Sequence, residues 1–228
     1  MAVAFDAVAS TTGSDVTSLS WTHTPVGTPT AAGMGFYAFD SGNATSATYN
    51  STTFGAAVAT TSDASGDNCQ LFGLANPASG ARSVTVAWAV STFPVAGSVT
   101  VTGSDTTTCY RAGSATSSAG SSTALQVTIA SNTDDLVYSV GGQDPCGTLT
   151  AGNTQRWNQA SGGLDGIGQT EAGGASVAIT ATASGSNPWC ITGASFLAAA
   201  AGSASASAAL LILNPNLHGN LYGLRTNL

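Results

Sequence analysis

Few residues in this chain are of a type and spacing that could perform chemistry. There are two histidines, His23 in the segment WTHTP and His218 near the C-terminus. No Gly-x-Ser-x-Gly nucleophile motif is present. The acidic residues fall in segments rich in Asp, Asn, Gly and Pro, which are turn-forming residues. We therefore expect a protein that is not an enzyme and holds no cofactor, with both histidines at ordinary edge or surface positions.

Two binding sites remain as alternatives. Asp63, Asp67 and Asn68 offer oxygen ligands suited to a weak Ca²⁺ site, although the EF-hand spacing is absent. Trp157 and Trp189 lie near expected strand starts, and if either were exposed it could stack on a glycan ring. By contrast, Trp88 alternates in phase with Val84 and Val86, which favours a core position.

The four cysteines lie too far apart to form a zinc knuckle. We expect the strands near 98–102 and 136–140 to run in the same direction, because the strand between them reverses the chain twice. Cys109 and Cys146 would then emerge at the same end of the fold, where a disulfide is geometrically feasible. Cys69 and Cys190 are expected to be reduced and in or near the core. Assembly in a reducing cytosol would argue against the Cys109–Cys146 bridge.

Composition excludes several classes of partner. Lys+Arg is 4, Asp+Glu is 11, and the net charge is -7. Binding nucleic acid or anionic lipid requires clustered basic residues, so neither partner is expected. Charged residues are only 7% of the chain, while hydrophobic residues reach 43%, which excludes a charged, core-less disordered chain. The N-terminus lacks the positive region of a signal peptide, so we expect the protein to be made in a cytoplasm without one.

The hydrophobic pattern has a period of two almost throughout residues 1–197. RSVTVAWAV is the clearest strand, with Val84, Val86, Trp88 and Val90 on one face. DLVYSV is apolar on both faces and is expected to be central. Turn signals separate many such short strands. This spacing predicts an all-β fold, a single jelly-roll-like antiparallel β-sandwich over residues 1–197.

The composition changes after Phe196. Residues 198–209 are almost entirely Ala, Gly and Ser and are expected to form a linker, followed by an apolar arm over residues 210–228. The arm could be a disordered tail, could cover an edge of its own sandwich, or could dock on a partner chain, and docking is preferred. Its expected partner-docking residues are Leu210, Leu211, Leu213, Leu217, Leu221, Tyr222, Leu224 and Leu228.

Several stretches resemble a family of small β-sandwich proteins of phage and prophage particles. These are ATYNSTTF, ending at Phe54; CQLFGLANPASGARSVTVAW, from Cys69 to Trp88; VTVTGSDTTT, from Val99; and NPWCITGASFLAA, from Asn187. The resemblance covers residues 2–199 and carries no catalytic residues. It implies a virion structural protein: a capsid decoration protein, a head fibre or a tail appendage.

The sequence and the resemblance together predict a capsid decoration (cement) protein on the particle surface. Its partners would be capsid or tail subunits and copies of itself in a homo-oligomer. The alternative is a tail or fibre module that binds host glycan.

Overall fold

The computed structural model describes residues 1–40, 42–145 and 147–200, and over these residues the chain forms fifteen strands and no helix. The predicted all-β class is therefore confirmed. The strands are β1 (Ala4–Thr12), β2 (Val16–His23), β3 (Ala31–Ala38), β4 (Ser46–Tyr49), β5 (Thr52–Thr53), β6 (Ala59–Ser62), β7 (Asn68–Ala75), β8 (Arg82–Thr92), β9 (Pro94–Thr102), β10 (Thr116–Ala130), β11 (Leu136–Gln143), β12 (Leu149–Ala151), β13 (Thr154–Ser161), β14 (Leu164–Ala172) and β15 (Ser176–Phe196).

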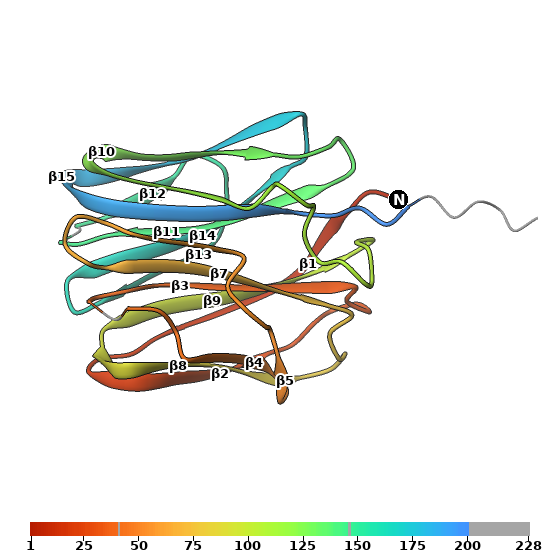
Figure 1. The fold of residues 1–228 in the computed structure, drawn as a ribbon, viewed down its shortest axis with the longest axis horizontal. Coiled ribbons are helices and arrows are strands. Elements are labelled where there is room, and N and C mark those ends of the chain that lie inside the picture. The colour runs from red at the N-terminus through yellow and green to blue at the C-terminus, as the bar shows by residue number, and fades with distance from the viewer. Residues whose placement is uncertain (41, 146, 201–228) are drawn as a thin grey trace, which may run out of the picture.

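The strands form three antiparallel sheets stacked in layers (Figure 1). The central sheet has the order β1-β9-β3-β7-β6. A four-stranded sheet, β2-β8-β4-β5, covers one of its faces, and the six-stranded sheet, β10-β15-β11-β14-β13 with β12 attached to β15, covers the other. Every residue of β3 is buried, because both of its faces are covered by a neighbouring sheet.

The six-stranded sheet doubles over on itself through its two long strands. Ser122 of β10 pairs with Asn187 of β15, but Ala124 already pairs with Thr182. Four residues of β15 therefore lie opposite one residue of β10, and both strands bend back at this point, as Figure 1 shows. The bend packs Leu125 and Ile179 over Ile191 in a separate apolar cluster.

The interface between the four-stranded and central sheets contains Trp88, which is 4% exposed. Val84 and Val86 point inward with it, as predicted. Val99 of β9 lies on the other face of the central sheet, in the interface with the six-stranded sheet. Val90 was expected to point inward and is 50% exposed. The pairing of β8 with β2 jumps from Ala87 to Thr92, so the alternation is interrupted at Val90.

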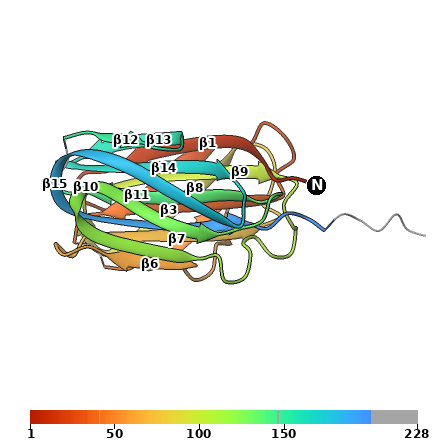
Figure 2. The ribbon, with the colours of Figure 1, turned by 90° about the horizontal axis from the view of Figure 1, so that it is seen from above.

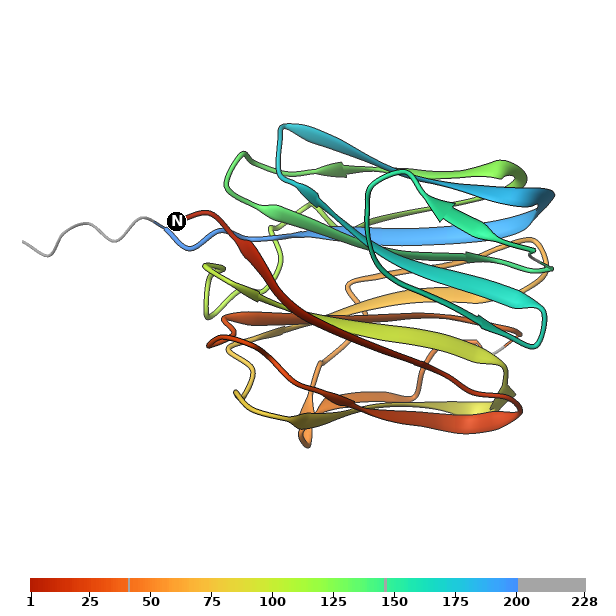
Figure 3. The ribbon, with the colours of Figure 1, turned by 180° about the vertical axis from the view of Figure 1, so that it is seen from behind.

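The layers are joined along one edge of the stack by β1. Figure 3 shows this strand, in dark red, running diagonally across the layers from the N-terminus. Arg156 of β13 places its guanidinium 3.6 Å from the centre of the Phe5 ring in β1. Seen from above in Figure 2, β1 and β13 lie along one side of the stack and β6 along the other. The central and six-stranded sheets are thereby linked at an edge that would otherwise be open.

Candidate functional site

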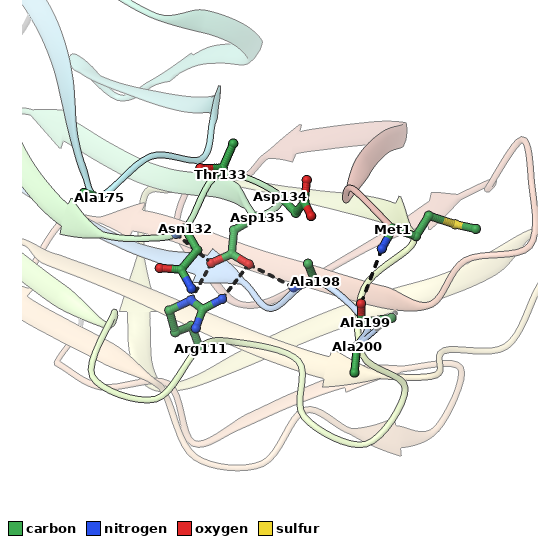
Figure 4. A pocket seen from close by; sticks show the side chains of 10 residues that line it. All are labelled: Met1, Arg111, Asn132, Thr133, Asp134, Asp135, Ala175, Ala198, Ala199 and Ala200. Carbon is green, nitrogen blue, oxygen red and sulfur yellow. Dashed lines mark hydrogen bonds and ion pairs between the residues drawn. The ribbon is translucent and has the colours of Figure 1, made fainter. Parts of the chain in front are cut away.

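Both ends of the described chain meet at one end of the stack, beside a surface cavity (Figures 1 and 4). This cavity has a volume of about 500 Å³ and is open to solvent. We call it the exit pocket, because Ala200, the last residue that the structure describes, lines it. It is lined by Met1, Arg111, Asn132, Thr133, Asp134, Asp135, Ala175, Ala198, Ala199 and Ala200.

Asp135 organises the wall of the exit pocket. Its side chain is fully buried and forms an ion pair with Arg111, whose Nη2 donates to Oδ1 at 2.9 Å. The carboxylate also accepts from the amides of Asn132 and Ala198 (Figure 4). The Ser195 hydroxyl donates to Oδ2 as well. Burial alone would raise the pKa of Asp135. The Arg111 and amide hydrogen bonds outweigh burial and hold the pKa below its usual value, so the carboxylate stays charged.

The same network holds the end of β15. The Ala198 amide donates to Asp135 Oδ1 at 2.9 Å, and the Ala199 amide donates to the Gly103 carbonyl at 3.0 Å. The N-terminal ammonium lies 3.5 Å from the Ala199 carbonyl. Hydrogen bonding to the fold thus continues to Ala199, beyond the expected linker start at residue 198, and the chain leaves from a fixed point.

The Arg111–Asp135 ion pair was not predicted from the sequence. Asp134 and Asp135 were assigned to a turn, and the turn is present, since the Asp135 amide donates to the Asn132 carbonyl. Of the two carboxylates, however, only that of Asp135 is buried. A sequence signal was available, because an acidic residue directly before the apolar strand β11 requires a cationic or amide partner when it is buried.

The expected arm residues from Leu210 to Leu228 lie outside the described residues, as does Cys146. The proposed Cys109–Cys146 disulfide is wrong, because Cys109 is a free thiol that donates to the Ala32 carbonyl at 3.6 Å. Cys69 and Cys190 are also free and buried, as expected.

The strand directions explain the error. β9 ends beside Ala198, where Ser104 forms a β-bridge, while β11 begins there and ends opposite Trp189. β9 and β11 therefore run in opposite directions. The loop after β9, which carries Cys109, and the chain after β11 leave opposite ends of the stack, about 23 Å apart along β11.

Neither tryptophan forms a sugar platform. Trp157 is buried and donates to the Tyr138 hydroxyl at 3.1 Å, with its indole against the glycines of neighbouring strands, Gly97 and Gly168. Trp189 is buried and donates to the Ser122 hydroxyl at 3.0 Å. Glycan stacking on either ring is thereby ruled out in this fold.

Asp63 and Asp67 make a structural turn. Oδ1 of Asp63 accepts from the amides of Ser65 and Asp67, and the Tyr37 hydroxyl lies 3.1 Å from Asp63 Oδ2 and 3.0 Å from Asp67 Oδ2. Burial, with a smaller contribution from Asp63, raises the pKa of Asp67 to about 6. Within residues 1–200, leaving aside the two positions not described, no group of three or more His, Cys, Asp or Glu side chains could hold a metal ion.

His23 is fully buried, contrary to the expected surface position. Its Nε2 lies 3.1 Å from Thr100 Oγ1, and because that hydroxyl donates to Asp6, Nε2 must carry the proton. The Nδ1 atom then accepts from the Ser98 hydroxyl at 2.8 Å. Burial lowers the pKa of His23 to about 4, although Asp6 raises it, so the ring is neutral and has a structural role.

Comparison with protein-family models, curated proteins and solved structures gives no match for this chain. Over the residues that the structure describes, no helix has the length and apolarity needed to cross a membrane. The exit pocket and the surface of the stack are therefore the features of this chain that bear on its function.

Proposed function

We propose that this chain is a non-enzymatic structural protein of a phage particle, a capsid decoration protein that bridges shell subunits. The β-stack would be the rigid body, and residues 210–228 would dock it on a capsid subunit or on a neighbouring copy. The proposal combines the family resemblance with the apolar composition of the arm.

The observation that carries the proposal is that hydrogen bonds fix the chain at Ala198 and Ala199, just before it leaves the described fold. Asp135, itself buried, anchors the Ala198 amide, and Ala199 is hydrogen-bonded to Gly103. A segment that begins at a fixed point loses less freedom on binding than one that follows a frayed strand end. Each leucine buried on a partner would contribute about 1.5–3 kcal/mol before ordering costs.

The test is removal of residues 201–228, a cut placed after Ala200, the last residue that the structure describes. We expect the shortened protein to keep its melting temperature but to lose oligomerisation in light scattering and co-sedimentation with shells assembled from the capsid protein of the phage that would encode it. A full-length Leu217→Ser, Leu221→Ser, Leu224→Ser variant should behave in the same way, which separates loss of apolar contacts from loss of chain length.

Two outcomes would contradict docking. If the shortened protein still assembled on shells, the arm would not be the attachment element. If its melting temperature fell sharply while the full-length chain was monomeric and did not bind shells, the arm would instead cover an edge of its own stack.

A further inference from the structure

A second cavity, which we call the edge groove, lies between the four-stranded sheet and the central sheet. Its volume is about 460 Å³, within the roughly 300–1,000 Å³ range of small-ligand sites. The segment after β5 closes one side as it crosses between the two sheets, seen in orange in Figure 1. The groove is lined by Asn43, Ala44, Thr45, Ser46, Ala47, Thr53, Gly55, Ala56, Ala57, Thr60, Gln70 and Phe72.

The polar wall is a fixed amide cluster. Gln70 is 3% exposed, and its Nε2 donates to Asn43 Oδ1 at 2.9 Å and to Thr60 Oγ1 at 3.2 Å. Its Oε1 accepts from the Ala44 amide at 2.8 Å. Because Asn43 Oδ1 takes the hydrogen bond from Gln70, the Asn43 amide nitrogen is directed away from Gln70. The exposed Asn43 is thus held in one orientation before any ligand arrives.

The other wall is apolar and equally rigid. Phe72 is 4% exposed and is packed by the rings of Phe36 and Phe54 beneath it. Ala47 and Ala57 add methyl groups beside it, and the backbone of the closing segment is held by the Phe54 amide, which donates to the Ala47 carbonyl at 3.0 Å. Phe72 and Ala47 are nearly buried and form the base, so the accessible C–H surface of the edge groove is that of Ala44, Ala56 and Ala57, next to amide and hydroxyl groups.

This pairing matches the chemistry of a sugar ring, which has C–H faces and hydroxyl edges. No lining residue is ionisable, so a carboxylated or sulfated sugar would find no cation in the groove, and the net charge of -7 would oppose its approach. Neutral hydroxyl groups, by contrast, can exchange hydrogen bonds with Asn43, Ser46, Thr53 and Thr60.

We propose that the edge groove binds a neutral saccharide, one or two sugar units of a larger glycan. The site does not involve the C-terminal arm, and it lies between sheet edges rather than at the exit pocket. Saccharide binding would give the stack a recognition function separate from attachment. The test of this binding is independent of the test of the decoration role.

The test is binding of the full-length chain to an array of neutral glycans and of sialylated or uronic-acid glycans, with affinities then measured by calorimetry for the neutral glycan that binds best. We expect binding only to neutral members. Asn43→Ala should weaken it at least 10-fold, and Ala56→Trp, at an exposed position of the groove, should abolish it. Thr85→Ala, on the outer face of the same sheet, is the matched control and should bind as wild type.

Each variant is first checked for an unchanged melting temperature, because Asn43→Ala removes one of the two acceptors of the buried Gln70 amide and leaves Thr60 Oγ1 as the other. Ala56→Trp is at an exposed residue outside this cluster, so it tests the groove with the amide cluster intact. Three results would overturn the proposal: no glycan bound, a preference for anionic glycans, or wild-type affinity in both groove variants. None of these results affects shell binding through the arm, which is measured separately.

Discussion

Trp88 is the largest side chain between β8 and the central sheet, and it packs edge-on against Phe36 with ring centroids 5.1 Å apart. Its indole Nε1 is buried and makes no hydrogen bond. Its contribution to stability must therefore come from buried area and packing. Trp88→Ala should lower the free energy of unfolding by about 3–5 kcal/mol, the usual range for a large cavity. Urea denaturation measures this decrease in the free energy of unfolding.

Trp88→Phe is the control for this experiment. It keeps an aromatic ring against Phe36 and removes a buried N–H that has no partner, so it should cost clearly less than alanine. A loss below about 1 kcal/mol for Trp88→Ala would contradict the packing described here.

The burial of some side chains could be predicted from the sequence, and that of others could not. The inward positions of Val84, Val86 and Trp88 follow from alternation, because β8 pairs regularly there. Val90 could not be placed, since the irregularity that exposes it depends on pairing with β2, a strand distant in sequence. The burial of Trp157 likewise depends on glycines in two other strands, Gly97 and Gly168.

At the scale of elements, most strands were predicted and their partners were not. β11 was expected to be central, and all its residues are buried. The expectation that β9 and β11 run in the same direction failed because it assumed that β10 reverses the chain between them. Instead, β10 and β11 both pair antiparallel to β15, and β10 bends within its own length. Such long-range pairings leave no local periodic signal.

The Asp135 network provides a prediction for the end of β15. Asp135→Ala would leave Arg111 and the Ser195 and Ala198 donors without their acceptor, so we expect it to lower the free energy of unfolding by about 2–4 kcal/mol. It should also speed amide hydrogen exchange at Ala198. Asp134→Ala, at the adjacent exposed position, should change stability by less than about 0.5 kcal/mol.

Equal effects of Asp135→Ala and Asp134→Ala would mean that the ion pair does not hold the strand end. Because the pKa of Asp135 is lowered in the folded protein, its stabilising contribution is present above its unfolded pKa and is lost as the pH falls through the folded pKa. The difference between Asp135→Ala and wild type should accordingly shrink in strong acid.

At the scale of the whole molecule, two buried groups at different sheet interfaces respond to pH in opposite ways. His23 lies under the four-stranded sheet with its pKa lowered to about 4. The folded state therefore binds its proton less readily than the unfolded chain, and stability falls as the pH drops from about 6.5 to 4. Asp67, beside Asp63 and the Tyr37 hydroxyl, has its pKa raised to about 6. The folded state binds that proton more readily, so stability rises as the pH drops from about 6 to 3.8.

The two effects oppose each other between pH 6 and 4, and each should become visible when the other group is removed. Relative to wild type, His23→Gln should gain stability as the pH falls through this range, because the His23 penalty is gone. Asp67→Asn should lose stability relative to wild type over the same range, because the compensating proton uptake is gone. Subtracting the free energy of unfolding of wild type from that of His23→Gln cancels Asp144, whose pKa burial and Asp63 also raise. In Asp67→Asn the small effect of Asp144 on the pKa of Asp67 is lost together with the carboxylate. Urea denaturation at pH 7, 6, 5 and 4 gives both differences in the free energy of unfolding. If the two differences changed in the same direction with pH, His23 and Asp67 would not have the opposite pKa shifts described here.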